Sequence, residues 1–173
     1  MSSHRAVFYR RSASALAAAL ALAACGAEKS DRPASPTAPS SSRAGAELPF
    51  RGSLTSESLV PPPNAVEVGE GTASHLGRFT VELTAVVTAG AATGTMALTA
   101  ANGDQLFATF VGQGEFIPPN VARLVEVATI IGGTGRFEGA TGTFTMVRVQ
   151  VVDFATGLGS GDGSFDGRIN LAR

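Results

Sequence analysis

Short runs that alternate apolar and polar residues, separated by glycines, dominate the second two-thirds of this chain. In residues 79–87 the alternation has a period of two, typical of a strand with one face on a core. Asn102-Gly103 lies between two such runs and predicts a type I′ hairpin turn, in which both central residues adopt positive φ. The other runs with strand composition are residues 50–54, 72–76, 95–100, 106–111, 121–131, 143–152 and 164–171.

These runs predict an all-β fold, with one domain over residues 47–173. About eight short strands in a single domain indicate a sandwich or a barrel. Closure into a barrel removes exposed strand edges, so we expect an antiparallel, closed barrel of about eight strands. The interior of such a barrel is either filled by side chains or holds one small ligand.

A glycine-rich segment, residues 132–142, joins two of the longest runs. It lacks the lysine of a phosphate-binding loop, and Gly133, Gly135 and Gly139 are spaced one residue too far for a dinucleotide fingerprint. Both motifs also require a following helix, whereas residues 143–152 have strand composition. We therefore expect a glycine turn and bulge between two barrel strands, and no nucleotide.

The same segment carries a family resemblance. Gly132-Gly133-Thr134-Gly135-Arg136-Phe137, followed by Gly139-Ala140-Thr141-Gly142, resembles the Gly-Gly-Thr-Gly-x-Phe-x-x-Ala-x-Gly stretch of dirigent proteins and the related allene oxide cyclase barrels. The resemblance implies a calycin-like antiparallel barrel with an apolar cavity. Plant members steer radical coupling or cyclise an epoxide, with acidic, Asn or Tyr side chains in the cavity. The predicted domain has no Tyr, and none of its acidic residues can be aligned with a cavity acid of the plant members. The resemblance therefore implies the fold and assigns no catalytic residue.

Residues 1–24 have the order of a secretory signal peptide, in which arginines precede a short apolar run, residues 13–24. That run is about half the ~20 residues that a helix needs to cross a bilayer, so no permanent span is expected. Its end, Leu22-Ala23-Ala24-Cys25, resembles the lipobox of bacterial lipoproteins. The resemblance implies cleavage before Cys25 and a diacylglycerol on its thiol. The alternative is an ordinary signal peptide followed by a chance cysteine.

Residues 25–46 are expected to form the lipidated cysteine and a disordered Ser/Pro/Ala linker, because they contain almost no large apolar side chains. Gly26 follows the cysteine where an aspartate would indicate retention at the inner membrane. The expected location is therefore the cell envelope, with a lipid anchor in the outer membrane, facing the periplasm or the surface.

Charge and composition exclude several classes of function. The chain has 13 basic and 14 acidic residues, and loss of the leader's three arginines would leave 10 against 14, a net charge of −4. A chain with this charge has no basic patch that would bind nucleic acid, so no nucleic-acid partner is expected. Attachment to the membrane is expected to come from the acyl chains of the lipid anchor. Cys25 is the only cysteine, and the predicted domain has one histidine and no lysine. Neither a metal site nor a cofactor is expected.

Few side chains of the predicted domain are suited to chemistry. His75 is its only imidazole and is the candidate general base, with a structural or surface histidine as the alternative. Glu82 lies on the polar face of its run and is the second acid–base candidate, with simple solvation as the alternative. Arg123, Glu126 and Arg148 lie in otherwise apolar runs.

The two arginines are candidate ligand-binding residues, because a guanidinium recognises carboxylates through two hydrogen bonds. Arg123 and Arg148 would either pair with acids inside the barrel, meet an anionic ligand, or face outward as ordinary charges. Phe110 and Phe144 are candidates for an apolar cavity lining, together with Phe79 and Phe107.

The sequence predicts a membrane-anchored envelope lipoprotein whose barrel binds a small apolar ligand or a protein partner, without catalysis. One alternative is an isomerase or cyclase that acts in the cavity, which requires His75 or Glu82 to point into it. Another is a structural envelope protein with a solid core and an exposed apolar patch. A fully packed interior would exclude the ligand-binding function.

Overall fold

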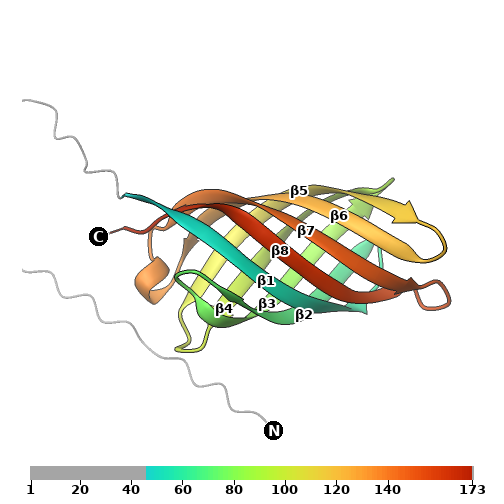
Figure 1. Ribbon diagram of the computed structural model, residues 1–173, viewed down its shortest axis with the longest axis horizontal. Coiled ribbons are helices and arrows are strands. Elements are labelled where there is room, and N and C mark those ends of the chain that lie inside the picture. Colours follow the sequence, from blue (N-terminus) through green and yellow to red (C-terminus); the bar gives the residue numbers. More distant parts are fainter. Residues whose placement is uncertain (1–45, 173) are drawn as a thin grey trace, which may run out of the picture. The chain divides into compact units, whose positions relative to one another are not determined.

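A computed structural model describes residues 46–172, which form an antiparallel β-barrel of eight strands. Each strand pairs with its sequence neighbours, and β1 pairs with β8 to close the barrel (Figure 1). The predicted fold class is therefore confirmed. The elements are β1 (Glu47–Val60), β2 (Asn64–Ala73), β3 (Gly77–Thr88), β4 (Ala91–Ala100), β5 (Gln105–Ile117), β6 (Val121–Gly133), η1 (Gly135–Phe137), β7 (Thr141–Asp153) and β8 (Leu158–Asn170).

The predicted leader, the lipidation site Cys25 and the linker up to residue 45 lie outside the described residues. Within the described part, no helix is long and apolar enough to cross a membrane.

The strand expected at residues 72–76 is wrong in its position. The second strand is β2 (Asn64–Ala73), and residues 74–76 form the turn that leads to β3. β2 was missed because its inward positions include Gly69 and Gly71, which give no apolar alternation. A Cβ on Gly71 would lie 2.8 Å from Cζ of Phe79, so the large side chain of β3 occupies the space that β2 leaves.

The hairpin turns also differ from expectation in type. The chain does turn at Asn102-Gly103, but only Gly103 has positive φ (89°), and the Gly103 amide donates to the Ala100 carbonyl. This is a type I turn followed by a left-handed glycine, a common longer hairpin loop. The two-residue turn with positive φ at both positions lies between β3 and β4 instead, at Ala89 (φ 50°) and Gly90 (φ 82°).

The glycine-rich segment forms the predicted turn and bulge. Ile131 is the extra residue where β6 shifts register against β5, and η1 follows directly. Gly135 has a φ of 55°, and a Cβ there would lie 2.0 Å from a carboxylate oxygen of Asp104. The Arg136 guanidinium donates to the Leu76 carbonyl, 3.1 Å away, which ties this turn to the β2–β3 turn.

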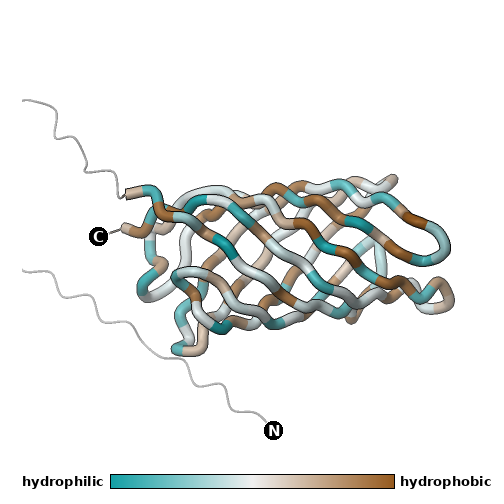
Figure 2. Tube along the Cα trace, in the orientation of Figure 1, coloured by the Kyte–Doolittle hydropathy of each residue, from teal (hydrophilic) through white to brown (hydrophobic). Residues whose placement is uncertain are grey.

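One half of the barrel interior is filled by aromatic side chains. Hydropathy alternates along the strands (Figure 2), and the inward positions near the chain ends carry phenylalanines. The ring of Phe50 lies 5.3 Å from that of Phe144 and 5.0 Å from that of Phe165, centroid to centroid. Phe137 of η1 is also fully buried. We call the buried rings of Phe50, Phe144 and Phe165 the aromatic plug. Burying one such side chain contributes about 1.5–3 kcal/mol, so the half of the barrel that holds the plug is the main source of apolar stabilisation.

Candidate functional site

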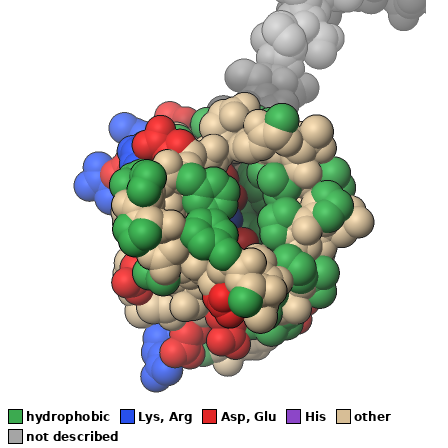
Figure 3. Space-filling model, turned by 90° about the vertical axis from the view of Figure 1, so that its right-hand side faces the viewer, with side chains coloured by type: hydrophobic (Ala, Val, Ile, Leu, Met, Phe, Trp, Pro, Cys, Tyr) green, Lys and Arg blue, Asp and Glu red, His purple; other side chains and the backbone are tan. Residues whose placement is uncertain are grey.

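The other half of the barrel is hollow. A cavity of about 250 Å³ opens at the end formed by the β1–β2, β3–β4, β5–β6 and β7–β8 loops. Figure 3 looks into this end: the centre is hollowed, hydrophobic side chains surround the opening, and charged atoms are visible inside. Apolar side chains of the wall include Ala65, Leu83, Ala85, Ala92, Ala122 and Leu124.

The cavity exists because the inward side chains near this end are small. Four of the wall residues are alanines, and Gly90, Gly114, Gly157 and Gly159 also line the space. The same eight strands form both ends of the barrel, so the difference between plug and cavity lies in side-chain volume. A barrel of this strand number has room for side chains or for one small ligand, and this chain uses one half for each.

A buried ionic cluster forms the floor of the cavity. Nε and Nη2 of Arg148 donate to the two carboxylate oxygens of Glu126, at 2.9 and 2.6 Å. Nη1 of Arg148 donates to Oε2 of Glu67, and Nε2 of Gln150 donates to the same oxygen at 2.9 Å. Ser56 completes the cluster, with Oγ 3.4 Å from Nε2 of Gln150. All five side chains are buried.

Glycines on the neighbouring strands make room for this cluster. A Cβ on Gly112 would lie 2.6 Å from Cγ of Glu126, and a Cβ on Gly163 would lie 2.6 Å from Cγ of Arg148. Gly161 of β8 is paired with both Gln150 and Ser56. β8 and β1 lie between β7 and β2, and their inward residues beside the cluster, Gly161, Gly163 and Ser56, are small. Arg148 and Gln150 can therefore reach across to Glu67.

Arg148 stays charged in this setting. Burial alone would lower the pKa of its guanidinium, but the charges and hydrogen bonds of Glu126 and Glu67 outweigh that and raise the pKa above its ordinary value. The cluster therefore holds a permanent cation between two carboxylates. Removal of Arg148 would leave two buried carboxylates without a cation, which is costly.

Of the predicted ligand-binding residues, only Arg148 lies at the cavity. Arg123 is exposed on the outer face of β6. Phe110 and Phe144 point inward and are buried, but they fill the core: Phe110 occupies the space over Gly94, and Phe144 belongs to the aromatic plug. Arg148 pairs with acids, which is one of the three outcomes considered for it.

The two acid–base candidates both lie outside the cavity. His75 is exposed in the β2–β3 turn, at the plugged end, where its Nε2 lies 3.1 Å from the Pro49 carbonyl oxygen. Glu82 is exposed on the outer face of β3, because the inward positions of that strand are Phe79, Val81 and Leu83. Neither side chain is placed to act on a molecule in the cavity.

Sequence reasoning missed Glu67 and Gln150 as cavity residues and gave Glu126 no role. Glu126 had a visible signal, since it interrupts an apolar run. Glu67 had none, because β2 was not recognised as a strand over this stretch. Once β2 is in place, Ala65 and Glu67 share its inward face, and that alternation is the signal that identifies Glu67.

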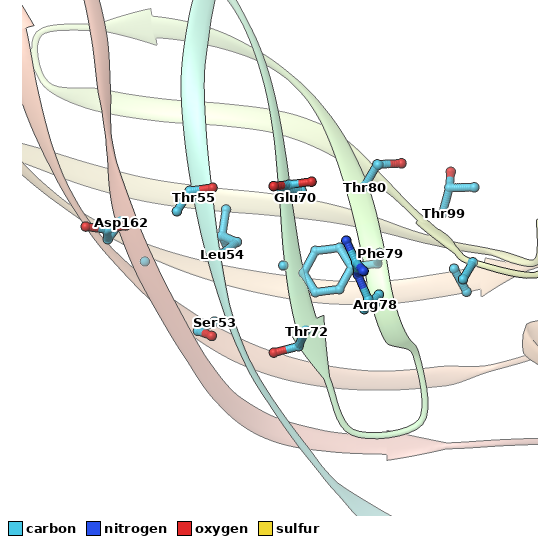
Figure 4. A pocket seen from close by; sticks show the side chains of 14 residues that line it. Ser53, Leu54, Thr55, Glu70, Thr72, Arg78, Phe79, Thr80, Thr99 and Asp162 are labelled. Atoms are coloured by element: carbon cyan, nitrogen blue, oxygen red, sulfur yellow. The ribbon is translucent and has the colours of Figure 1, made fainter.

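A second depression lies on the outer surface of β1, β2 and β3 (Figure 4). It encloses about 700 Å³, but it is broad and open to solvent. Its rim consists of outward side chains such as Thr55, Glu70 and Thr80, all exposed. No residue of the buried ionic cluster lies in it, so the interior cavity is the better candidate site.

No family model and no curated protein matches this chain. Among solved structures, one pterocarpan synthase dirigent protein aligns with a TM-score of 0.47 and 14% identity, over 76% of this chain and 99% of that chain. A second pterocarpan synthase dirigent protein aligns with a TM-score of 0.44 and 16% identity, over 76% of this chain and 88% of that chain. Both of these solved structures are dirigent proteins.

Proposed function

We propose that this protein binds one small, largely apolar molecule in the open half of its barrel, without changing it chemically. The observation that carries this proposal is a cavity of about 250 Å³ with apolar walls and a few polar groups at its floor. That combination is typical of small-molecule sites, in which apolar walls supply affinity and a few polar groups orient the ligand.

The two alternatives have less support. An isomerase or cyclase that uses His75 or Glu82 needs one of them beside the ligand, and both are exposed outside the cavity. A purely structural role does not account for the cavity in one half of the barrel. A cavity lowers the free energy of unfolding, since its lining atoms lack packing partners.

A protein partner, the other binding function that the sequence predicts, is supported by one feature of the outer surface. Val111 of β5 and Val127 of β6 are directly paired and point outward, with exposed fractions of 58% and 49%. Exposed apolar side chains on adjacent strands favour contact with another protein. The native mass of the chain, measured in the experiment below, reports such a complex as well as a ligand.

We also propose that the chain is a lipoprotein anchored to the envelope through Cys25. In the barrel, β1 begins at Glu47, opposite Asn170 of β8, at the plugged end. The first described strand therefore enters the barrel at the end opposite the cavity mouth. Cys25→Ser should abolish acylation and membrane fractionation. If that variant still sediments with membranes at the mature mass, the anchor is refuted.

Native mass spectrometry of the chain, isolated from a bacterial envelope extract, tests ligand binding. We expect a small apolar adduct that disappears on denaturation. The matched variants are Ala85→Phe, which places a large ring in the cavity, and Val86→Phe, which places the same ring on the outer face of the same strand. The adduct should be lost from the first and kept by the second. An adduct that survives Ala85→Phe, or no adduct from repeated extracts, would refute the proposal.

A further inference from the structure

The cavity has an excess of negative charge. Two carboxylates lie at its buried floor, those of Glu67 and Glu126, against the single guanidinium of Arg148. Glu115 does not add to this charge, because it is exposed and is paired with Arg123 on the outer face of β5 and β6. At the floor itself, two carboxylates share one cation, so one negative charge is left without a partner of opposite sign.

The uncompensated charge is located on Glu67. Glu126 uses both of its oxygens on Arg148. Glu67 accepts its two hydrogen bonds, from Arg148 and Gln150, on Oε2 alone, and no described residue donates to Oε1.

Oε1 of Glu67 also faces the cavity space. In the described part of the chain, every side-chain nitrogen or oxygen that is fully buried has a hydrogen-bond partner. Oε1 has none, so it is in contact with open space, and the side chain of Glu67 is 9% exposed, against 4% for Glu126 and 3% for Arg148. An acceptor atom with negative charge thus points into an apolar-walled cavity.

Resting on the proposed function, we propose that the ligand is a small organic cation, whose ammonium group donates to Oε1 of Glu67 while its apolar body lies against the alanine-rich wall. A buried carboxylate without a full set of partners is costly, and an ammonium donor removes that cost. An anionic head would meet the excess negative charge instead. The charge of Arg148 is already offset by the two carboxylates that it pairs with, Glu126 through Nε and Nη2 and Glu67 through Nη1.

The size of the cavity limits the body of the ligand. An apolar cavity of about 150 Å³ holds one benzene ring. The cavity here, of about 250 Å³, therefore suits one ring with a short chain that reaches the floor. Phenylethylamine, phenylethanol and phenylacetate are matched probes of this size that differ in the charge of the head group.

Isothermal titration calorimetry with these three probes tests the inference. The protein is the chain from residue 25 onward with Cys25→Ser, so that neither acyl chains nor detergent compete for the cavity. At neutral pH we expect phenylethylamine to bind at least ~10-fold more tightly than phenylethanol, since hydrogen bonds to charged groups are the stronger ones. Phenylacetate should bind most weakly.

Two variants on one strand assign the effect to a residue. Glu67→Gln keeps the size of the side chain and should remove the advantage of the amine over the alcohol, while alcohol binding changes by less than about 3-fold. Glu70→Gln removes a carboxylate from the outer face of β2 and should leave all three affinities unchanged. Persistence of the amine preference in Glu67→Gln would contradict the assignment.

Titration of the Cys25→Ser protein, with Glu67 and Glu70 intact, distinguishes the two proposals. If phenylethanol binds and phenylethylamine is no tighter, or if phenylacetate is tightest, the cationic-ligand inference is overturned and the binding function stands. If none of the probes binds and native mass spectrometry shows no adduct, the binding function itself is overturned.

Discussion

The two ends of this barrel are built on the same strands but hold different contents. At one end, the inward side chains of β1, β7 and β8 are Phe50, Phe144 and Phe165, whose rings touch one another. At the other end, the inward side chains of β2 and β3 include Ala65 and Ala85, which leave a cavity. Stability and binding are thus separated along one axis, and the ionic cluster lies at the boundary between them.

This separation explains how a small barrel remains stable with a cavity inside it. A cavity lowers the free energy of unfolding, because the atoms that line it lose dispersion contacts and apolar burial. The aromatic plug supplies both on its side of the cluster, so the cavity side is free to carry small residues. The following substitutions test whether the two ends differ as the structure implies.

The largest difference is expected for phenylalanines at opposite ends. Phe50→Ala in the plug should lower the free energy of unfolding by about 3–5 kcal/mol, because the side chain is fully buried. Phe116→Ala at the cavity mouth should lower it by less than about 0.5 kcal/mol, because that ring is 66% exposed. Urea denaturation measures both. Equal losses would mean that the plug is not the principal source of stability.

Next in size is the effect of removing the cation at the boundary. Arg148→Leu should cost about 3 kcal/mol near neutral pH, because Glu67 and Glu126 are left buried and facing each other. In the variant, the two carboxylates repel each other without a cation between them, and acid relieves this repulsion by neutralising one of them. Its stability relative to the unsubstituted protein should therefore recover as the pH falls.

Thermal unfolding of Arg148→Leu and the unsubstituted protein across a range of pH measures this trend. Arg51→Leu serves as the control, because Arg51 forms an exposed ion pair with Asp166, in which both side chains are about two-thirds exposed. We expect its cost to be small and nearly independent of pH. If the stability difference between Arg148→Leu and the unsubstituted protein stays constant with pH, the carboxylates of Glu67 and Glu126 are not held close together in the variant.

The smallest difference is expected for two inward glycines of β8. A Cβ on Gly163 would lie 2.6 Å from Cγ of Arg148, whereas the nearest atom to a Cβ on Gly159, at the cavity end, is 3.3 Å away. Gly163→Ala should cost about 1–3 kcal/mol through overpacking. Gly159→Ala should cost less, because the Val151 carbonyl oxygen at 3.3 Å needs to shift only slightly and the next two atoms lie at 3.5 Å, an ordinary contact distance. Similar costs in urea denaturation would contradict the packed boundary.

Much of the barrel was predictable, because its signals are local. Alternation in residues 79–87 and the β-branched runs at 121–131 and 143–152 predict strands that the structure contains. β2 was not predictable from its own residues, since two of its inward positions are glycines, Gly69 and Gly71. The side chain of Phe79 on β3 occupies the space beside Gly71. In the candidate site, Arg148 and Glu126 carried a signal because each interrupts an apolar run, although only Arg148 was assigned a role. His75 and Glu82 were chosen by residue type alone.

The sequence by itself determined the strands, their glycine-rich connections and the scarcity of reactive side chains, because each of these depends on neighbouring residues. Only the tertiary structure decided which charges meet. Glu67 and Arg148 are 81 residues apart, and they come into contact because β1 pairs with β8 and the intervening inward positions are small. Alternation assigns residues to the two faces of a strand, but barrel closure and register decide which side chains share the interior, and these depend on every strand at once.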